Sequence, residues 1–410
     1  RRKGYTPESI RDFIETVGGG KADAWIDLGS LAIVPDPLLA SWPDPHGVGD
    51  AARALVAALR SRGDLDAPAT ALATAIRAAG AADARFPGPD RLGLELTYRR
   101  LRLFTWAWMA CIAGGLLAAF GLARQRRVPR ILGLVGLVAG IGLLAAGLGL
   151  RIILSADNAA VARLYDTFPF VAFVAAVLGL VFAIWGRSPV AVCAAGLAAG
   201  LCAMVGEALP PDHGAFLEPL QPVLRYRFWL WLHVKIIVGS YGAFLLAWMM
   251  ANVELWRAAG GRRPVDADRA RDIHRVMQVG LVLCTAGTLL GGVWADFSWG
   301  RFWGWDPKEV WALVIILVYL VPMHLRYIGA VSTTGLAAWA VCGFLSVVMS
   351  WYGVNFLLGA GLHAYATGDG FADSVSTDQI IVLGLCAAQI VLTWSQVVLT
   401  RRRADAAPTA

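Results

Sequence analysis

Residues 133–150 read GLVGLVAGIGLLAAGLGL, a run of eighteen apolar or small residues without a charged side chain. A helix needs about 20 such residues to cross a hydrocarbon core of roughly 30 Å, and the run extends on both sides to cover 131–154. Its glycines and alanines are typical of membrane helices that pack closely. This stretch predicts a transmembrane helix and excludes an ordinary soluble fold for this part of the chain.

Eight further runs have the same character, so the predicted fold class is all-α, a polytopic membrane helix bundle. The nine predicted spans are 103–123, 131–154, 168–186, 189–208, 228–256, 276–295, 309–326, 332–358 and 379–400.

The charges divide the 410 residues into two domains. Only 16% of residues are charged, against roughly 25% in soluble domains. Residues 1–100 hold 26 of these charges and are neutral overall, so we expect a small extracytoplasmic helical domain there. Residues 101–410 form the transmembrane domain and carry the net charge of +7. Because this net charge is distributed over some 310 mostly apolar residues, we expect contact with membrane lipid and no nucleic-acid partner.

Lys and Arg are unevenly divided between alternate loops, and their excess marks the cytoplasmic side. One set of loops holds fifteen of these residues, and the opposite set holds six, or nine with the three that precede the first span. The smaller set includes the segment around Trp303 and places residues 1–100 outside the cytoplasm. A domain that is already outside before the first span predicts an upstream export segment beyond this chain.

Tryptophan is concentrated in one predicted loop, 294–311. Five of the seventeen tryptophans fall there: Trp294, Trp299, Trp303, Trp305 and Trp311. An aromatic belt at the membrane interface would spread over all helix ends, whereas this cluster occupies one loop. It indicates a flat apolar surface for a large planar ligand.

The end of this loop also has a structural interpretation. Asp306 is placed to cap the next helix, with Pro307 at its first position and Glu309 completing a capping box. Arg301 and Lys308 either pair with carboxylates of a ligand or extend to the interface as ordinary interfacial cations.

Two of the six histidines fall at one level beside the tryptophans. His233 lies about five residues into the fifth span, roughly 8 Å from its outer end, and His363 follows the outer end of the eighth span. Two imidazoles beside a planar apolar surface suit the axial ligation of a haem iron. His324 is deeper, in the cytoplasmic half of the seventh span, where an ionisable group is a candidate functional residue. His46, His213 and His274 are interpreted as loop residues.

WGRFWGWDPKEVWALV at 299–314 resembles the tryptophan-rich signature of the haem-handling proteins of cytochrome c maturation. The flanking segments narrow the resemblance to the CcsA or ResC type of the System II pathway. They are RLYDTFPF at 163–170, LQPVLRYRFWLWLHV at 220–234, SYGAF at 240–244 and YGVNFLLGAGLHAY at 352–365. The resemblance covers about 155–365.

The resemblance implies haem b as cofactor, with His233 and His363 as external axial ligands and His324 as a ligand of a second, membrane-embedded haem. It implies a bacterial inner-membrane protein that presents haem on its outer face for thioether attachment to the CxxCH motif of apocytochrome c. A ResB/CcsB-type partner, or an upstream fused region, would supply the missing inner ligand.

Two alternative functions remain at this point: a haem permease without ligase activity, and a membrane b-type electron carrier. No residue has the pattern of a nucleophile or general base, so the chain is predicted to be the haem-presenting component of a cytochrome c synthase. The six cysteines lack CxxC spacing and predict neither disulfides nor a thiolate metal site.

Overall fold

A computed structural model describes residues 47–61, 63–81, 89–155, 161, 163–186, 188, 190–208, 227–261, 263–358 and 377–405. The chain divides into two compact units, Arg1–Arg102 and Leu103–Ala410. The predictions for His46, His213 and His363 concern residues outside the described ranges.

The first unit contains the helices α4 (Val48–Arg60), α5 (Asp66–Ala81) and α6 (Pro89–Leu101). Leu55 of α4 and Ala69 and Ala73 of α5 are buried, because α4 and α5 pack together through their apolar faces. Small alanines on one face and charges on the other give this amphipathic pairing. The described residues of this unit are therefore largely helical, as expected for residues 1–100.

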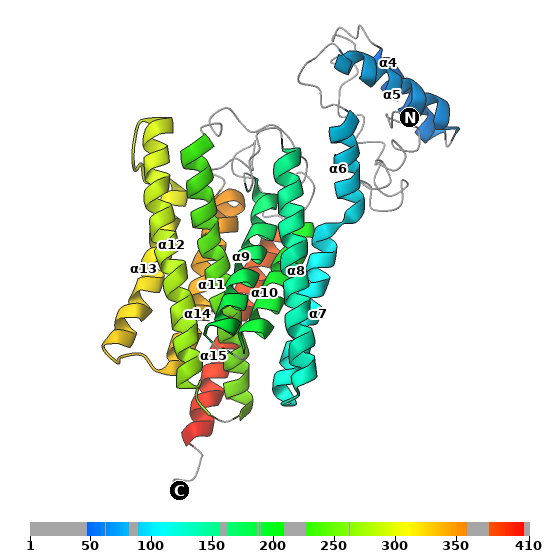
Figure 1. Ribbon diagram of the computed structural model, residues 1–410. Coiled ribbons are helices and arrows are strands. Elements are labelled where there is room, and N and C mark those ends of the chain that lie inside the picture. Colours follow the sequence, from blue (N-terminus) through cyan, green and yellow to red (C-terminus); the bar gives the residue numbers. More distant parts are fainter. Residues whose placement is uncertain are drawn as a thin grey trace. The chain divides into compact units, whose positions relative to one another are not determined.

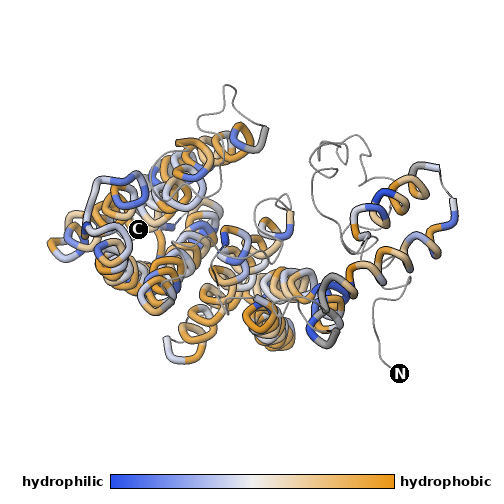
Figure 2. The backbone as a smooth tube through the Cα atoms, turned by 90° about the horizontal axis from the view of Figure 1, so that it is seen from above, coloured by the Kyte–Doolittle hydropathy of each residue, from blue (hydrophilic) through white to orange (hydrophobic). Residues whose placement is uncertain are grey.

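The second unit is a bundle whose helices run side by side (Figure 1) and are apolar along most of their length (Figure 2). Its elements are α7 (Leu103–Ala123), α8 (Arg127–Leu154), α9 (Leu164–Ile184), α10 (Ala191–Ala208), α11 (Arg227–Gly261), α12 (Ala267–Trp299), α13 (Pro307–Tyr327), α14 (Thr333–Val348), the π-helical segment η4 (Met349–Leu358) and α15 (Thr377–Asp405). Within the described residues, nine helices are long and apolar enough to span a membrane. The prediction of an all-α membrane protein with nine spans is confirmed.

Glycines hold several of these helices in direct backbone contact. A Cβ atom at Gly114 of α7 would lie 2.8 Å from the carbonyl oxygen of Gly133 of α8, and one at Gly115 would lie 2.8 Å from the backbone nitrogen of Leu197 of α10. In lipid, helices associate through such close packing. The glycine-rich runs that predicted spans therefore also fix how α7, α8 and α10 pack.

Several helices are longer than their predicted spans, among them α11 and α12. α11 has 35 residues and α12 has 33. The Asp266 side chain caps the start of α12 by accepting from the backbone N–H groups of Asp268 and Arg269. Much of the basic segment that was predicted to be a loop is therefore helical, and His274 lies in α12. The start of α11 and the connection between α12 and α13 lie at the same end of the bundle (Figure 1).

Candidate functional site

The site lies where α11 and α12 approach most closely near that end of the bundle. A Cβ atom at Gly287 of α12 would lie 2.8 Å from the backbone nitrogen of Ile237 of α11. One turn further along α12, a Cβ atom at Gly291 would lie 2.6 Å from Cε1 of His233. Gly291 leaves the space that the imidazole of His233 occupies, and Gly287 lets the backbones of the two helices approach each other.

A backbone carbonyl sets the tautomer of His233. Its Nδ1 atom lies 2.7 Å from the carbonyl oxygen of Gly287. Because a carbonyl oxygen only accepts hydrogen bonds, Nδ1 carries the proton and donates it, and Nε2 of the neutral ring carries the lone pair. This is the arrangement found when histidine binds a metal, since the second ring nitrogen then orients the ligand.

Trp294 of α12 packs beside this imidazole, and Trp299 packs against Trp294. The Trp294 ring lies parallel to the His233 ring, with 6.4 Å between centroids and 3° between planes. Trp299 meets Trp294 edge-on, at 4.7 Å and 69°. Trp294 is 1% exposed and belongs to a helix, so the tryptophan loop is shorter than predicted: only residues 300–306 connect α12 and α13.

The connecting loop turns sharply and presents its own pair of indoles. Gly300 and Trp305 have φ angles of 68° and 57°, and Trp305 is 70% exposed. The rings of Trp303 and Trp305 lie 5.9 Å apart at 90°. The four indoles of Trp294, Trp299, Trp303 and Trp305 thus form two edge-on pairs and do not share one plane.

The predicted capping box is confirmed. The Asp306 side chain accepts from the backbone N–H of Lys308 at 3.2 Å, and Glu309 accepts from the backbone N–H of Asp306 at 3.1 Å. Glu309 also accepts from the N–H of Gly304 at 2.8 Å. The two carboxylates therefore hold the loop against the start of α13.

Both cations of this segment contact protein groups. Arg301 lies 3.4 Å from Glu309 and its guanidinium lies 5.7 Å from the Trp299 ring centre. Lys308 donates from Nζ to the carbonyl oxygen of Ser350 at 2.9 Å. Their side chains connect the loop to α12, α13 and η4, which is a structural role that the sequence interpretation did not include.

The first turn of η4 joins three other helices. Ser350 lies 3.1 Å from the hydroxyl of Tyr241 of α11. The indole N–H of Trp351 donates to Thr167 of α9 at 2.8 Å, and its ring stacks on Phe168 at 4.5 Å. Together with Lys308 from α13, these contacts anchor η4, the element that precedes the segment containing His363.

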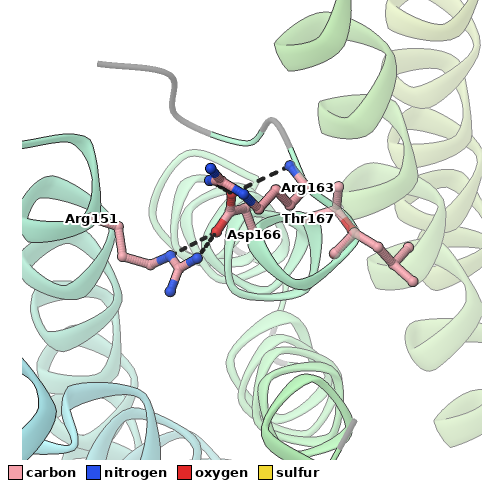
Figure 3. A network of polar contacts seen from close by, with 5 residues as sticks. Arg151, Arg163, Asp166 and Thr167 are labelled. Carbon is pink, nitrogen blue, oxygen red and sulfur yellow. Dashed lines mark hydrogen bonds and ion pairs between the residues drawn. The ribbon is translucent and has the colours of Figure 1, made fainter. Parts of the chain in front are cut away.

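A buried ion pair fixes the start of α9 (Figure 3). Arg151 of α8 donates from Nε to Asp166 at 2.6 Å, and both side chains are almost fully buried. Arg163 lies 3.8 Å from the other carboxylate oxygen. Removing one partner of such a pair leaves an uncompensated buried charge at a cost of about 3–5 kcal/mol. The pair thus holds in place the helix that bears Thr167.

His324 and His274 lie far along their helices from this end of the bundle. His324 is exposed on α13, and its Nδ1 lies 2.9 Å from the carbonyl oxygen of Leu320 of the same helix. His274 is half-buried, and its Nε2 is buried without a hydrogen-bond partner. His324 is therefore separated from the His233 site, as the sequence predicted from its depth in the span.

Residues 141–363 match the family described as "Cytochrome C assembly protein". This match covers more than half of the chain. The chain belongs to the cytochrome c assembly protein family. The matched residues of this family member include the ion pair, both glycines at His233, the tryptophans and His363.

Three relatives illustrate the range of this family. Protein NrfI of Wolinella succinogenes is 34% identical over 308 residues, which cover 69% of this chain but 32% of NrfI. Cytochrome c biogenesis protein CcsA of Prochlorococcus marinus (strain MIT 9303) is 30% identical over 240 residues, covering 50% of this chain and 75% of the relative. The CcsA of Synechococcus sp. (strain JA-3-3Ab) is 30% identical over 337 residues, covering 67% and 96%. The chain spans about a third of the length of NrfI.

Two site residues escaped the sequence interpretation. Gly287 and Gly291 stand in a run with other glycines, so their contact with His233 has no separate signal in the sequence.

Proposed function

We propose that this protein binds haem b at the end of the bundle that carries the tryptophan loop and presents it for thioether attachment to apocytochrome c. His233 and His363 are its two axial ligands in this proposal. The observation that carries it is the imidazole of His233, whose Nδ1–H is held by Gly287 beside Trp294 and Trp299.

The residues around His233 fit a haem. The bond from Nδ1 to Gly287 orients the ring and increases the basicity of Nε2, which is the atom that would bind iron. Trp294 and Trp299 supply an apolar wall, and Trp303 and Trp305 extend it along the loop. Histidine at both axial positions would prevent oxygen from binding to the iron before apocytochrome c binds.

The proposed chemistry depends on positioning. Each cysteine of a CxxCH motif adds its S–H across one vinyl double bond of the haem, so a carbon–sulfur bond forms, the proton goes to the neighbouring carbon, and no oxidant is consumed. The contribution of the protein is to hold the vinyl edge where two thiols can reach it, and such orientation contributes a large part of the rate in reactions of this kind.

His324 belongs to a second site in this proposal. It is exposed on α13, so a histidine from a ResB/CcsB-type partner, or from an upstream fused region, can approach it and complete a membrane-embedded haem site. The protein lies in a bacterial inner membrane in this proposal, and the distribution of Arg and Lys between the loops supports an orientation with the His233 end outside the cytoplasm.

The test is transfer of haem from the purified full chain, with and without its partner, to a CxxCH peptide. A synthase component yields a peptide with covalent haem, visible by mass and by an absorption band that survives acid extraction. Release of free haem without a covalent product indicates a permease, and haem that stays bound and only changes redox state indicates an electron carrier.

A further inference from the structure

Ser350 of η4 connects two other helices through two hydrogen bonds. Its carbonyl oxygen accepts from Nζ of Lys308, the second residue of α13, at 2.9 Å, and its hydroxyl lies 3.1 Å from the hydroxyl of Tyr241 of α11. Ser350 is 1% exposed and Tyr241 is 6% exposed. These three residues, Lys308, Ser350 and Tyr241, form a buried Ser350 junction between α13 and the helix that bears His233.

The bond from Lys308 is the stronger of the two. Hydrogen bonds with a charged donor are roughly twice as strong as neutral ones. The neighbouring cation Arg301 lies beside the carboxylate of Glu309, whereas the ammonium of the partly buried Lys308 donates to a main-chain carbonyl. An ammonium that has left water and then loses its acceptor is strongly disfavoured, so the position of Ser350 is coupled to that of Lys308.

Lys308 bonds to the helix at the point where its hydrogen-bond pattern changes. The α-helix α14 continues directly into the π-helical segment η4. Such segments are rare and are frequent at functional sites. Two carbonyls in the first turn of η4 accept from side chains, that of Ser350 from Lys308 and that of Trp351 from Asn355 at 3.0 Å. These donors support a local geometry that the backbone alone seldom adopts.

The Ser350 junction fixes one end of the tryptophan loop relative to His233. The other end of the loop continues α12, which packs directly against α11. Lys308 lies in the first turn of α13, which the capping box at Asp306 joins to the loop. Tyr241 follows His233 on α11 by eight residues, or about 12 Å along the helix. Both ends of the loop are therefore held to the helix that supplies the proposed iron ligand.

We propose that Lys308 is a positioning residue, which acts through Ser350 and Tyr241 to hold the tryptophan loop in the place that thioether formation requires. This inference rests on the proposed function. A displacement of about 1 Å far from the reacting atoms can lower a rate about 100-fold, whereas the affinity for haem depends mainly on the iron ligands. Loss of the Ser350 junction should therefore slow the transfer of bound haem much more than it weakens binding.

The experiment measures two quantities on the purified full chain with its partner: the affinity for haem, and the single-turnover rate at which bound haem is transferred to a CxxCH peptide. Tyr241→Phe and Lys308→Met each remove one hydrogen bond of the junction. Each should lower the transfer rate by roughly 10- to 100-fold and leave haem affinity and the visible spectrum nearly unchanged. Lys308→Arg, which keeps a charged donor, should restore part of the rate.

The same bundle offers two matched controls. Tyr319 is fully buried and its hydroxyl has no hydrogen-bond partner within the described part of the chain, so Tyr319→Phe removes the same atom as Tyr241→Phe without breaking a bond. Nζ of Lys235 on α11 likewise has no hydrogen-bond partner there, so Lys235→Met removes a lysine charge without removing a hydrogen bond. Both controls should transfer haem at the wild-type rate.

The double variant Tyr241→Phe/Lys308→Met tests whether the two bonds act as one unit. If Ser350 transmits the constraint from Lys308 to α11, breaking either bond already releases the loop, so the double variant should be little slower than the slower single variant. Rate losses that simply multiply would show that the two contacts act independently, against the proposal.

Three other results would also contradict the inference. The first is a wild-type transfer rate in both single variants, and the second is an equal loss of haem affinity and transfer rate. The third is a Lys308→Met variant that loses affinity for haem but not for haem dimethyl ester, because this lysine would then bind a propionate. If the wild-type protein transfers no haem to the peptide, the proposed function itself fails.

Discussion

His233 and His324 have contrasting surroundings in the same bundle. His233 is inserted between α11 and α12, where Gly291 leaves its space and Gly287 fixes its tautomer. His324 is exposed on α13 and contacts a carbonyl of its own helix. A ring that is already oriented loses little freedom when it binds a ligand, whereas an exposed ring needs a second surface. We infer that the chain prepares one histidine site by itself and leaves the other to a partner.

The largest effect should come from removing the prepared imidazole. His233→Gly should abolish c-type cytochrome formation and reduce haem affinity by more than the roughly 10- to 100-fold that loss of an outer-shell partner costs a metal site. His363→Gly should act in the same way if it supplies the second axial ligand. Visible spectra and cytochrome yield measure both effects.

Added imidazole provides the control for these variants, because it can fill a vacant axial position. It should partly restore the low-spin spectrum in either variant. Normal cytochrome maturation in both glycine variants would contradict the ligand assignment.

A slightly smaller effect should follow from removing the space for His233. In Gly291→Ala the new methyl group would lie 2.6 Å from Cε1 of the imidazole, so the ring must turn away from Gly287. Haem affinity should fall about tenfold, the lower limit for disturbing an orienting contact. Gly239→Ala is the matched control, since no atom lies within 4 Å of the added carbon. Equal affinity in the two variants would show that the ring does not depend on this space.

The wall beside His233 should tolerate another aromatic residue but not a small one. Trp294 is 1% exposed, so Trp294→Ala opens a cavity and should destabilise the protein by about 3–5 kcal/mol, while Trp294→Phe should lose much less stability and keep most of the haem. Thermal unfolding and haem occupancy report the two effects. Similar occupancy in the Phe and Ala variants would show that the aromatic surface is not needed.

The smallest effect should come from the exposed histidine in the isolated chain. His324→Ala should leave the haem spectrum of the chain alone unchanged and should remove a second bis-histidine signal only when the partner is co-expressed. His274 is the internal alternative, because its Nε2 is buried without a partner. Loss of the inner signal in His274→Ala, with no dependence on the partner, would show that the chain completes this site by itself.

The helices and their caps could be predicted because their signals are local. A span needs only an apolar run of sufficient length, and the cap at Asp306 needs only Pro307 and Glu309 at fixed offsets. The number of spans and the start of α13 were therefore predicted correctly. The lengths of α11 and α12 were underestimated, because a helix continues beyond the membrane wherever its caps allow and apolarity does not mark that end.

The contacts within the site could not be predicted, because they join distant parts of the chain. Nothing near Lys308 in sequence indicates that its ammonium reaches Ser350, and nothing near His233 indicates the carbonyl of Gly287. The expectation of a flat tryptophan surface failed for a related reason. Composition shows that indoles gather in one segment, but the angles between their rings depend on the turn at Gly300 and on the end of α12.

The left-handed backbone of Trp305 implies a conflict between stability and activity at the tip of the loop. A residue with a side chain costs roughly 1–2 kcal/mol in this conformation, which glycine adopts freely, and an indole that is 70% exposed regains little by burial. Trp305→Gly should therefore raise the melting temperature of the haem-free protein while it weakens cytochrome maturation. A tryptophan at a position where the backbone favours glycine is expected where the side chain serves a ligand or client and not the fold.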